Sequence, residues 1–558
     1  MFVPPPDTMP ATPFEDIDAA LARLDAKKEA WRAVSVPDRI ALLEGCIRST
    51  LAVAEEWAEI GARIKGAAAS SNVAGEEWLA GIMPTIRNAR LLVNALREKG
   101  QPKPAATRVA PDGRTVARVF PSTLFEKLMF AGATVDVWLE RDRPATQGAI
   151  YRGEGPTTGR VCCILGGGNV SSIPAMDALY KLFVEDEVVL LKMNPVNETL
   201  GPVLARAFEP LRAAGYLEVI YGGGDVGAYA VKHALVGACH ITGSDRTYNA
   251  IVWGDNARGT TRTVDKPFSA ELGCVTPVIV VPGPWSASDI EFQARHVASM
   301  VTQNASFNCN AAKVIIVARE WLQKDAFFEA VKQALSRTPP RRAYYPGATE
   351  RWAAFKKRYP SAQVVGTETE GAVPWTVIPR LDGDDYALTN EAFCGIVAEV
   401  QLDAPDYVGS HPGRFLKAAV EYANERCWGT LSCCVLVHPD TEEAHQEDFA
   451  NAIRDLRYGG IGINAWPGAL YGLVSPTWGA FPGHNPENIG SGMGVVHNAW
   501  LFDHPEKSVL RMPFRIRPKP AWFADHKNLL ALGRRLVEHE ANPTWRTFLR
   551  VALAGLKG

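Results

Sequence analysis

The chain has 558 residues, too many for one hydrophobic core, so we expect two or three domains. Hydrophobic residues make up 47% of it, charged residues 22%, and the formal net charge is -2. This balance is that of an ordinary globular protein, and it provides no broad basic field for nucleic acid or anionic lipid. The longest apolar runs fall short of the roughly 20 residues that cross a bilayer. We therefore expect neither a nucleic-acid partner nor a membrane span.

Cysteine and histidine usage argues against disulfides and metals. Ten cysteines are spread over the chain, and the pairs Cys162–Cys163 and Cys433–Cys434 lie in apolar runs typical of reduced core residues. The eleven histidines form no HExxH motif and no CxxC knuckle accompanies them, so we expect no metal site. Residues 1–20 have neither the charged nor the apolar region of a secretion signal. These features predict a reduced, cytoplasmic protein.

In chain order, the first predicted region is helical and runs from residue 13 to about residue 96, with apolar positions at helical spacing. Ser35, followed three residues later by Asp38, is a well-formed helix start. Residues 97–115 are rich in Pro, Gly and Arg and should form an exposed loop. Residues 132–158 alternate in polarity and carry few helix signals, which favours an extended arm.

The clearest region spans residues 159–254 and alternates apolar strand-like runs with helical ones. Strands are predicted at "RVCCILG", "EVVLLKMN", "LEVIYGG" and "VGACHITG", with a helix after each of the first three. This alternation favours a parallel sheet covered by helices on both faces. Ligands of such sheets bind beyond the carboxyl ends of the strands, so "GGGN", "KMNP", "YGGG" and "TGSD" should share one rim.

A second α/β alternation follows residue 284, with strands predicted at "AKVIIVA", "TVIPRL", "GIVAEVQL" and "IGINAW". Residues 465–494 are crowded with Gly and Pro, which is typical of a long ordered loop beside a functional site. Either an apolar tunnel or ordinary packing would explain the aromatic residues there, namely Trp466, Tyr471, Trp478 and Phe481. From about residue 518 we predict a basic helical tail.

Cys309 is the best nucleophile candidate among the cysteines. It stands between two asparagines in "SFNCNAAKVIIVA", on a loop that enters an apolar, β-branched run. A thiolate is stabilised by nearby amides or positive charge, which a loop end can supply and an apolar strand cannot. On these residues alone, a small structural cysteine remains the alternative.

Three further positions have both a chemical and a structural interpretation. Asn169 follows three glycines and opens a predicted helix, where its amide could donate to an oxyanion or simply cap the helix. Glu271 precedes a buried strand, where it could be a general base of raised pKa or a surface residue. Gly243 and Ser244 lie where the fourth strand gives way to a helix. Small residues there let a phosphate approach the helix N-terminus, or merely ease packing.

Taken in order, these pieces resemble the aldehyde dehydrogenase superfamily over roughly residues 25–515. The ordered segments are "AWRAVSVPDRIALLEG", "ILGGGN", "LLKMNP", "HITGSD", "AELG", "SFNC", "NEAFCG" and "GGIGINAW". Their order is far more specific than any one of them. The resemblance implies an α/β fold with two doubly wound α/β domains, one for a cofactor and one for catalysis, plus a β-arm for oligomerisation.

The same resemblance implies a division of the chain. Residues 13–283 would form the cofactor-binding domain, with residues 132–158 as its oligomerisation arm. Residues 284–460 would form the catalytic domain, residues 461–515 would return to the cofactor domain and the oligomerisation region, and residues 516–558 would be a C-terminal helical extension. An isolated hairpin is marginal without a partner sheet, so we expect a homodimer or homotetramer.

The resemblance also assigns roles to residues of this chain. Cys309 would attack the aldehyde carbon to form a thiohemiacetal, with Asn169 and the backbone amide of Cys309 holding the oxyanion. After hydride leaves for the nicotinamide of NAD or NADP, Glu271 would activate the water that hydrolyses the thioester to a carboxylic acid. The cofactor would be contacted by Lys192 at the adenosine ribose, Ser244 at the pyrophosphate, Glu391 at the nicotinamide ribose and Phe393 beside the ring, with Gly168, Gly243 and Leu272 nearby.

Three departures from the family pattern bear on specificity. "GGGN" stands where the family usually has "PWN", which opens the pocket wall near Asn169. Pro195 replaces an acid that commonly holds both ribose hydroxyls and repels a 2'-phosphate, so the choice between NAD and NADP stays open. Cys274 and Val275 stand where the family often has glycine and lysine.

Glu271 favours an NAD(P)-dependent aldehyde dehydrogenase that releases a free acid, because hydrolysis of a buried thioester needs a positioned base. An acylating enzyme or acyl-CoA reductase, in which coenzyme A replaces water, is the alternative within the family. A catalytically silent protein that keeps the fold for binding is the alternative from another class. The joint presence of Cys309, Glu271 and Asn169 argues against it. The expected substrate is a small-molecule aldehyde whose structure stays open.

Overall fold

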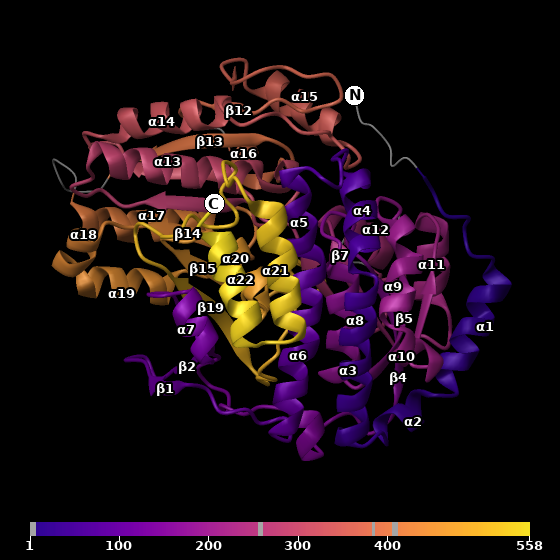
Figure 1. Cartoon of the computed structure of the whole chain (residues 1–558). Coiled ribbons are helices and arrows are strands. Elements are labelled where there is room, and N and C mark those ends of the chain that lie inside the picture. Colours follow the sequence, from indigo (N-terminus) through magenta and orange to yellow (C-terminus); the bar gives the residue numbers. More distant parts are fainter. Residues whose placement is uncertain (1–6, 255–260, 382–384, 404–410) are drawn as a thin grey trace.

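The computed structural model describes residues 7–254, 261–381, 385–403 and 411–558. The first six residues of the segment inspected for a secretion signal therefore lie outside the described residues. Two large sheets, each flanked by helices, organise the chain (Figure 1). This arrangement confirms the predicted fold class of two α/β units.

The first sheet has six strands among the described residues, in the order β17-β8-β7-β4-β5-β6. Its strands are parallel except β17, which pairs antiparallel with β8. All six residues of β5 are buried, as expected for a parallel sheet covered on both faces. The strands are β4 (Arg160–Leu165), β5 (Glu187–Lys192), β6 (Leu217–Ile220), β7 (Ala238–Gly243), β8 (Phe268–Leu272) and β17 (Gly492–Met493).

The boundaries of the helices that connect these strands differ from the sequence prediction in two places. Residues 198–215 form two short helices that meet at Phe208, because Pro210 has no N–H for a continuous helix. Asn169 does not open a helix, since α8 begins at Ile173 with Ser172 as its N-cap. The helices are α8 (Ile173–Phe183), α9 (Gly201–Ala207), α10 (Glu209–Ala213), α11 (Gly224–Lys232) and α12 (Asp245–Val252), with the single turn η4 (Glu198–Leu200).

The predicted N-terminal helical region is confirmed. The Ser35 hydroxyl accepts a hydrogen bond from the Asp38 backbone N–H at 3.3 Å, as its spacing predicted. The elements are α1 (Phe14–Asp25), α2 (Lys28–Arg32), α3 (Val36–Ala52), α4 (Ala54–Ile64), η1 (Asn72–Ala74), α5 (Gly75–Glu77), the π-helical η2 (Trp78–Ile82) and α6 (Met83–Arg97).

The second sheet has eleven strands within the described ranges, in the order β1-β2-β3-β19-β15-β14-β9-β10-β13-β12-β11. The seven strands from β19 to β12 are parallel, and the strands beyond them on both sides pair antiparallel. The parallel strands are β19 (Pro505–Arg511), β15 (Gly460–Ile463), β14 (Ser432–Leu436), β9 (Thr276–Val280), β10 (Ala312–Ala318), β13 (Ile396–Leu402) and β12 (Thr376–Ile378). The others are β1 (Ala106–Val109), β2 (Thr115–Phe120), β3 (Thr134–Leu139) and β11 (Gln363–Val364).

Helices pack along this second sheet (Figure 1). The long pair α13 and α14 lies together and follows the strand-to-helix alternation that the sequence predicted after residue 284. These helices are α13 (Ala287–Thr302), α14 (Lys324–Ser336), α15 (Ala348–Arg358), α16 (Tyr386–Thr389), α17 (Pro412–Arg426), α18 (Pro439–Ala444) and α19 (Gln446–Asp455).

The chain crosses from the six-stranded to the eleven-stranded sheet between β8 and β9, a gap of only three residues. The carboxyl end of β8 in the first sheet therefore lies close to the beginning of β9 in the second sheet. The prediction of a loop over residues 97–115 is wrong in part, because Ala106–Val109 forms β1 and pairs with β2. Gly and Pro obscured a strand whose partner follows it directly.

The last part of the chain covers the seam between the two sheets. It contains α20 (Gly468–Leu473), β16 (Trp478–Gly479), β18 (Val495–His497), α21 (Leu529–Ala541) and α22 (Trp545–Gly555). The predicted C-terminal helices are present, and α21 packs against α5 and α6 (Figure 1). No helix in the described part of the chain has the length and apolar run that a bilayer crossing requires.

Candidate functional site

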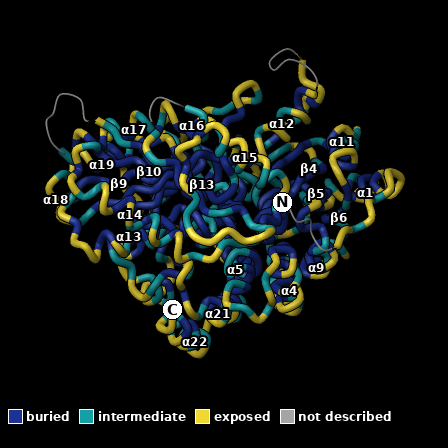
Figure 2. Tube along the Cα trace, turned by 90° about the horizontal axis from the view of Figure 1, so that it is seen from above, coloured by how far each residue is buried: buried dark blue, intermediate teal, exposed yellow. Residues whose placement is uncertain are grey.

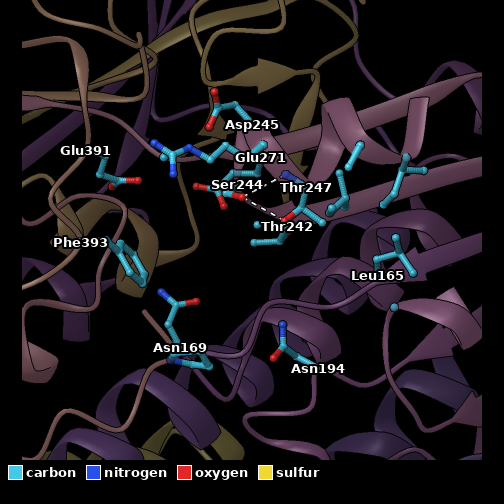
Figure 3. Close-up of a pocket in the computed structure, with 18 of the residues that line it drawn as sticks. Leu165, Asn169, Asn194, Thr242, Ser244, Asp245, Thr247, Glu271, Glu391 and Phe393 are labelled. Atoms are coloured by element: carbon cyan, nitrogen blue, oxygen red, sulfur yellow. Dashed lines mark hydrogen bonds between the residues drawn. The ribbon is translucent and has the colours of Figure 1, made fainter. Parts of the chain in front are cut away.

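A cavity of about 800 Å³ opens where the carboxyl ends of β4, β5 and β7 face the segments before β10 and β13. Eight of the ten residues that the sequence nominated line it, namely Asn169, Lys192, Gly243, Ser244, Glu271, Cys309, Glu391 and Phe393. Figure 3 shows Glu391 and Phe393 on one side of the pocket and Ser244 with Thr247 on another. Residues that are more than 200 positions apart in the sequence therefore share one site.

Two nominated residues lie behind the cavity wall. Leu272 is fully buried, and its backbone N–H donates to Ser491 at 2.8 Å. Gly168 packs against Asn194, and a Cβ added to Gly168 would lie 2.5 Å from the Asn194 Oδ1. Both residues support the wall, and neither lines the pocket.

One end of the cavity has the features of a site for a dinucleotide diphosphate. The N-termini of α11 and α12 both reach it, through Gly223, Gly224 and Ser244. A Cβ on Gly224 would meet no atom within 4 Å, so the backbone leaves open space there. Helix N-termini carry positive potential and unpaired N–H groups that bind phosphate.

Cationic side chains line the same end. Lys192, Lys232 and Arg246 all reach the cavity, and burial lowers the pKa of Lys192. The sequence analysis placed the Gly223–Gly224 pair on this rim as part of "YGGG", but it missed Lys232 and Arg246. It also missed that residues 222–227 read "GGGDVG", with the G-x-G-x-x-G spacing between β6 and α11. The donors, the small residues and the cations together fit a nicotinamide dinucleotide.

Cys309 lies on a loop with an unusual backbone. Asn304, Ala305 and Ser306 have φ angles of 55°, 56° and 69°, which side-chain-bearing residues rarely adopt. Such residues cost about 1–3 kcal/mol each unless the surroundings hold them. The Asn304 Nδ2 donates to the carbonyls of Asn169 and Phe307 at 3.0 and 3.2 Å, and the Ser306 hydroxyl donates to Cys394 O at 3.1 Å. This loop is therefore fixed in one shape ahead of the cysteine.

Exposure distinguishes Cys309 from the other cysteines. All ten cysteines are free thiols, nine of them are buried, and Cys309 alone is partly exposed. It lies three residues before β10, at the loop end where the sequence placed it. The alternative of a purely structural cysteine does not explain why this thiol faces the cavity.

Lys313 holds the loop from the other side, and the sequence analysis missed it. Its buried ammonium donates to the carbonyls of Asn308, Cys309 and Ala311 at 3.2 to 3.3 Å, and it forms an ion pair with Glu391 at 3.0 Å. A lysine inside the apolar run "AAKVIIVA", four residues after the cysteine, was the available signal. Lys313 therefore connects the loop that carries Cys309 to Glu391, the residue expected to bind the nicotinamide ribose.

Asn169 contacts the same loop. Its Nδ2 donates to Phe307 O at 2.9 Å, and its own carbonyl accepts from the Tyr344 hydroxyl at 3.0 Å. An amide nitrogen carries two N–H groups, so a second donor is available on the cavity side. Because α8 begins four residues later, the helix-cap interpretation of Asn169 is excluded.

Glu271 precedes the buried strand β9, as the sequence analysis expected, and it also lies inside β8, which that analysis did not predict. It pairs in register with Thr242 on one side and Gly492 on the other, and it is buried. The Trp478 indole N–H donates to its Oε1 at 3.3 Å. Burial raises the pKa of Glu271 to about 8, although hydrogen bonds from the Cys309 thiol and from Trp478 oppose the rise. A carboxyl group of this pKa exchanges protons near neutral pH.

The thiol and this carboxyl group interact directly. Burial raises the pKa of the Cys309 thiol well above its usual range, and the neighbouring carboxylates of Glu271 and Glu391 raise it further. The Lys313 ammonium acts in the opposite sense. Cys309 is therefore held as a thiol beside the Glu271 carboxyl group, which is the arrangement of a nucleophile beside a base.

Glu391 is held in a narrow space beside Gly273 and Cys274, of which Cys274 departs from the family pattern. Its Oε1 accepts from the backbone N–H of Cys274 at 3.4 Å, and a Cβ on Gly273 would lie 1.8 Å from its Oε2. Phe393 has φ 41°, and its ring centroid lies 5.1 Å from that of Tyr345. Arg351 fixes this turn by donating to the carbonyls of Ala392 and Phe393.

The aromatic residues of the late loop pack instead of lining the cavity. Trp466 and Trp478 are buried, and the Trp466 indole donates to Asn310 O at 3.0 Å. The Tyr471 hydroxyl lies 3.0 Å from the Ser172 hydroxyl. None of these three, nor Phe481, is among the residues that line the cavity. The packing interpretation is the one that the structure supports.

Across the described ranges, no group of three or more His, Cys, Asp or Glu side chains is arranged to hold a metal ion. The chemistry of the described site depends on the thiol, the carboxyl groups, the amides and the lysines named above.

Sequence and structure comparisons agree with this geometry. Residues 171–346 match the model of the aldehyde dehydrogenase family. No curated protein sequence shows significant similarity to the chain. Solved structures with the same fold include an NAD-dependent aldehyde dehydrogenase from Sinorhizobium meliloti, with 19% identity, a TM-score of 0.62, and 93% of this chain and 92% of that one covered.

Two further solved structures with this fold are complexes with a nicotinamide cofactor. A glyceraldehyde-3-phosphate dehydrogenase from Methanocaldococcus jannaschii complexed with NADP is 16% identical, with a TM-score of 0.61 and 90% and 95% of the two chains covered. An indole-3-acetaldehyde dehydrogenase complexed with NAD+ is 18% identical, with a TM-score of 0.61 and 90% and 89% covered. At these identities the likeness establishes the fold, and the family match establishes the lineage of its central segment. Residues 171–346 thus match the aldehyde dehydrogenase family, and the chain shares the fold of solved aldehyde dehydrogenases.

Proposed function

We propose that the protein oxidises an aldehyde to a carboxylic acid with NAD or NADP, through covalent intermediates on Cys309. The observation that carries the proposal is the pairing of the partly exposed thiol with the buried Glu271 carboxyl group, inside a cavity whose far end fits a dinucleotide. A binding protein has no need for a carboxyl group of raised pKa beside a cysteine.

In the first step, the Cys309 thiol gives its proton to water, and its sulfur attacks the aldehyde carbon. The resulting oxyanion accepts hydrogen bonds from the Asn169 amide and the Cys309 backbone N–H. Lys313 and the strained turn at residues 304–306 keep that N–H in place. The bound nicotinamide supplies the hydride acceptor.

In the second step, a thioester on Cys309 is hydrolysed. Glu271 takes a proton from water, the water oxygen attacks the thioester carbon, and the Cys309 sulfur leaves and regains a proton. Aldehyde, water and oxidised cofactor become acid, reduced cofactor and a proton, so atoms and electrons balance.

Cofactor binding is proposed for the cavity end near α11 and α12. Lys192 would contact the adenosine ribose, Ser244 and Gly243 the pyrophosphate, and Glu391 and Phe393 the nicotinamide riboside. Gly168 and Leu272 would support this wall from behind. The related structures bound to NAD+ and to NADP agree with either cofactor, and Pro195 lacks the carboxylate that would repel a 2'-phosphate.

The organisation follows from the same proposal. Residues 13–283 would bind the cofactor and residues 284–460 would carry the nucleophile, with residues 461–515 completing the cofactor side. The arm at residues 132–158 would join copies into a homodimer or homotetramer. We place the enzyme in the cytoplasm, where its ten thiols stay reduced.

The test is turnover of aldehydes with NAD or NADP, with and without coenzyme A. We expect reduced cofactor to form without coenzyme A, and Cys309→Ser to abolish it, while Cys427→Ser, at a buried cysteine away from the cavity lining, keeps it. Strict dependence on coenzyme A would instead establish the acylating alternative. Unchanged turnover in Cys309→Ser would disprove the nucleophile.

A further inference from the structure

The C-terminal helix α22 presents an apolar stripe to the outside. Trp545, Leu549, Leu553 and Leu556 are 55%, 56%, 62% and 71% exposed. Their spacing of four, four and three residues puts them on one side of the helix. Single exposed leucines are ordinary, but four aligned large side chains are not.

Helix α7 (Leu124–Met129) extends this stripe. Leu124 and Leu128 are 58% and 50% exposed. The Phe125 ring packs against the rings of Trp545 and Phe548, with centroids 5.0 and 5.4 Å apart, so α7 and α22 lie together. We call the surface formed by these six exposed apolar residues, together with the exposed cations Lys127, Arg546 and Lys557, the α7–α22 face.

The face has a fixed geometry. The opposite side of α22 is anchored, because Val551 and Ala554 are buried against Leu532 of α21. The Thr544 hydroxyl caps the helix by accepting from Thr547 N at 3.2 Å, and the Asn528 amide donates to Ala554 O at 2.9 Å. The exposed apolar side chains are therefore not the result of a loose end. Figure 2 shows α22 at the rim of the molecule.

The unpaired charges of α7 and α22 all have one sign, while Arg550 of α22 is paired with Glu538 of α21 at 3.4 Å. Lys127, Arg546 and Lys557 are exposed, and none of them has a carboxylate partner in the part of the chain that the structure describes. No acidic residue occurs in α22, and the one acidic residue of α7, Glu126, is buried and paired with Arg87. Apolar groups flanked by unpaired cations complement an apolar layer with an anionic surface.

We propose that the α7–α22 face docks the protein on the surface of an anionic lipid membrane. Trp545 and the leucines would enter the headgroup boundary, while Lys127, Arg546 and Lys557 would meet lipid phosphates. A second copy of this chain fits less well, because a two-fold axis through the face would bring the same three cations together with no carboxylate between them. The surface lies apart from the cavity and goes beyond the proposed function.

The test is co-sedimentation of the full chain with vesicles of phosphatidylcholine, with or without about 30% phosphatidylglycerol. We expect binding to the anionic vesicles that weakens as salt is raised. Leu549→Gln with Leu553→Gln, and separately Arg546→Glu with Lys557→Glu, should each reduce binding about tenfold or more. Leu322→Gln, at an apolar residue that is 94% exposed elsewhere, is the matched control and should bind as the parent does.

All of these substitutions are on the surface, so turnover measured without vesicles should be unchanged and will show that each variant is folded. Equal sedimentation with neutral and anionic vesicles, or full binding by both double variants, would overturn the proposal. A shift of the leucine double variant to a smaller species in analytical ultracentrifugation, without lipid binding by the parent, would assign the face to a second copy.

Discussion

At the scale of single residues, Glu271 is acted on by opposing influences. Burial raises its pKa to about 8, while the Cys309 thiol and the Trp478 indole N–H hydrogen-bond to it and lower the pKa. Below pH 8 the group holds a proton and cannot accept one from water. Above pH 8 it is a carboxylate and can act as the base for thioester hydrolysis.

We predict that steady-state turnover of the parent rises with pH and levels off above about pH 8. Glu271→Gln should reduce it about 100-fold or more, because general-base catalysis contributes at least that factor. The first burst of reduced cofactor should remain, since removing this carboxylate also removes a group that raises the pKa of Cys309. Stopped-flow absorbance of the reduced nicotinamide separates the two phases. Loss of the burst in the variant would contradict the assignment of Glu271 to the second step.

Site residues could be predicted from the sequence where they lie in short, recognisable segments. Cys309, Glu271 and Asn169 lie in short segments whose order along the chain matches the family, and all three line one cavity. Trp478 was not assigned a role because its partner is distant in sequence, whereas Lys313 was missed although three of its partners lie within five residues of it. The Trp478 indole contacts a carboxyl group 207 residues away. Such contacts follow from packing of the two sheets, which no local pattern encodes.

At the scale of elements, the Arg87 guanidinium connects helix α21 of the C-terminal extension to helices α7 and α20. Arg87 of α6 donates to Glu126 of α7 at 2.5 Å, to Glu540 of α21 at 2.8 Å and to the Leu473 carbonyl at 2.6 Å. Leu473 ends α20, five residues before Trp478. The helical extension is therefore part of the structure that holds the late loop over Glu271.

We predict that Glu540→Gln lowers the free energy of unfolding by about 3–5 kcal/mol, since it leaves part of a buried charge on Arg87 unpaired. Glu538→Gln is the matched control on the same helix, where the ion pairs with Arg535 and Arg550 are exposed. Its effect should stay within about 1 kcal/mol. Urea unfolding followed by tryptophan fluorescence measures both. Equal effects of the two substitutions would show that the buried network does not hold the extension.

How well the helices and strands could be predicted depended on how close their contacts are in the sequence. The strands and helices of residues 159–254 were predicted because sheet and helix periods alternate there without interruption. β1 was missed because Gly and Pro surround it, although it pairs with the strand that follows. The break between α9 and α10 could have been read from Pro210. The order of the eleven-stranded sheet joins strands hundreds of residues apart, and spacing along the chain does not specify it.

At the scale of the whole molecule, buried groups couple stability to pH. Burial alone lowers the pKa of His296 from 6.5 to about 3. The ring packs against Phe523 and Trp522, and its Nδ1 lies 3.2 Å from the Gln293 Oε1. The folded state therefore favours the neutral ring. A group with a lowered folded pKa contributes stability that is complete above its unfolded pKa and is lost as pH falls toward the folded value.

Glu540 adds to this loss at lower pH. Its pKa is lowered from 4.5 to about 2, because the coulombic effect of Arg87 and Arg90 outweighs burial. The corresponding stabilisation of about 3 kcal/mol is complete above pH 4.5 and disappears as the pH approaches 2. Acid unfolding should thus begin with histidine and continue with the carboxylates of the Arg87 network.

We predict that His296→Phe makes the free energy of unfolding less dependent on pH between 6.5 and 3. In that window the unfolded chain binds one proton more than the folded chain at this ring, which gives a slope of about 1.4 kcal/mol per pH unit. The variant should lose that much slope, while Phe523→Leu, in contact with the same ring, should shift the whole curve and keep its slope. Urea midpoints measured at half-unit steps of pH separate the two behaviours. If His296→Phe keeps the parental slope, the histidine is not the group that links acid to unfolding.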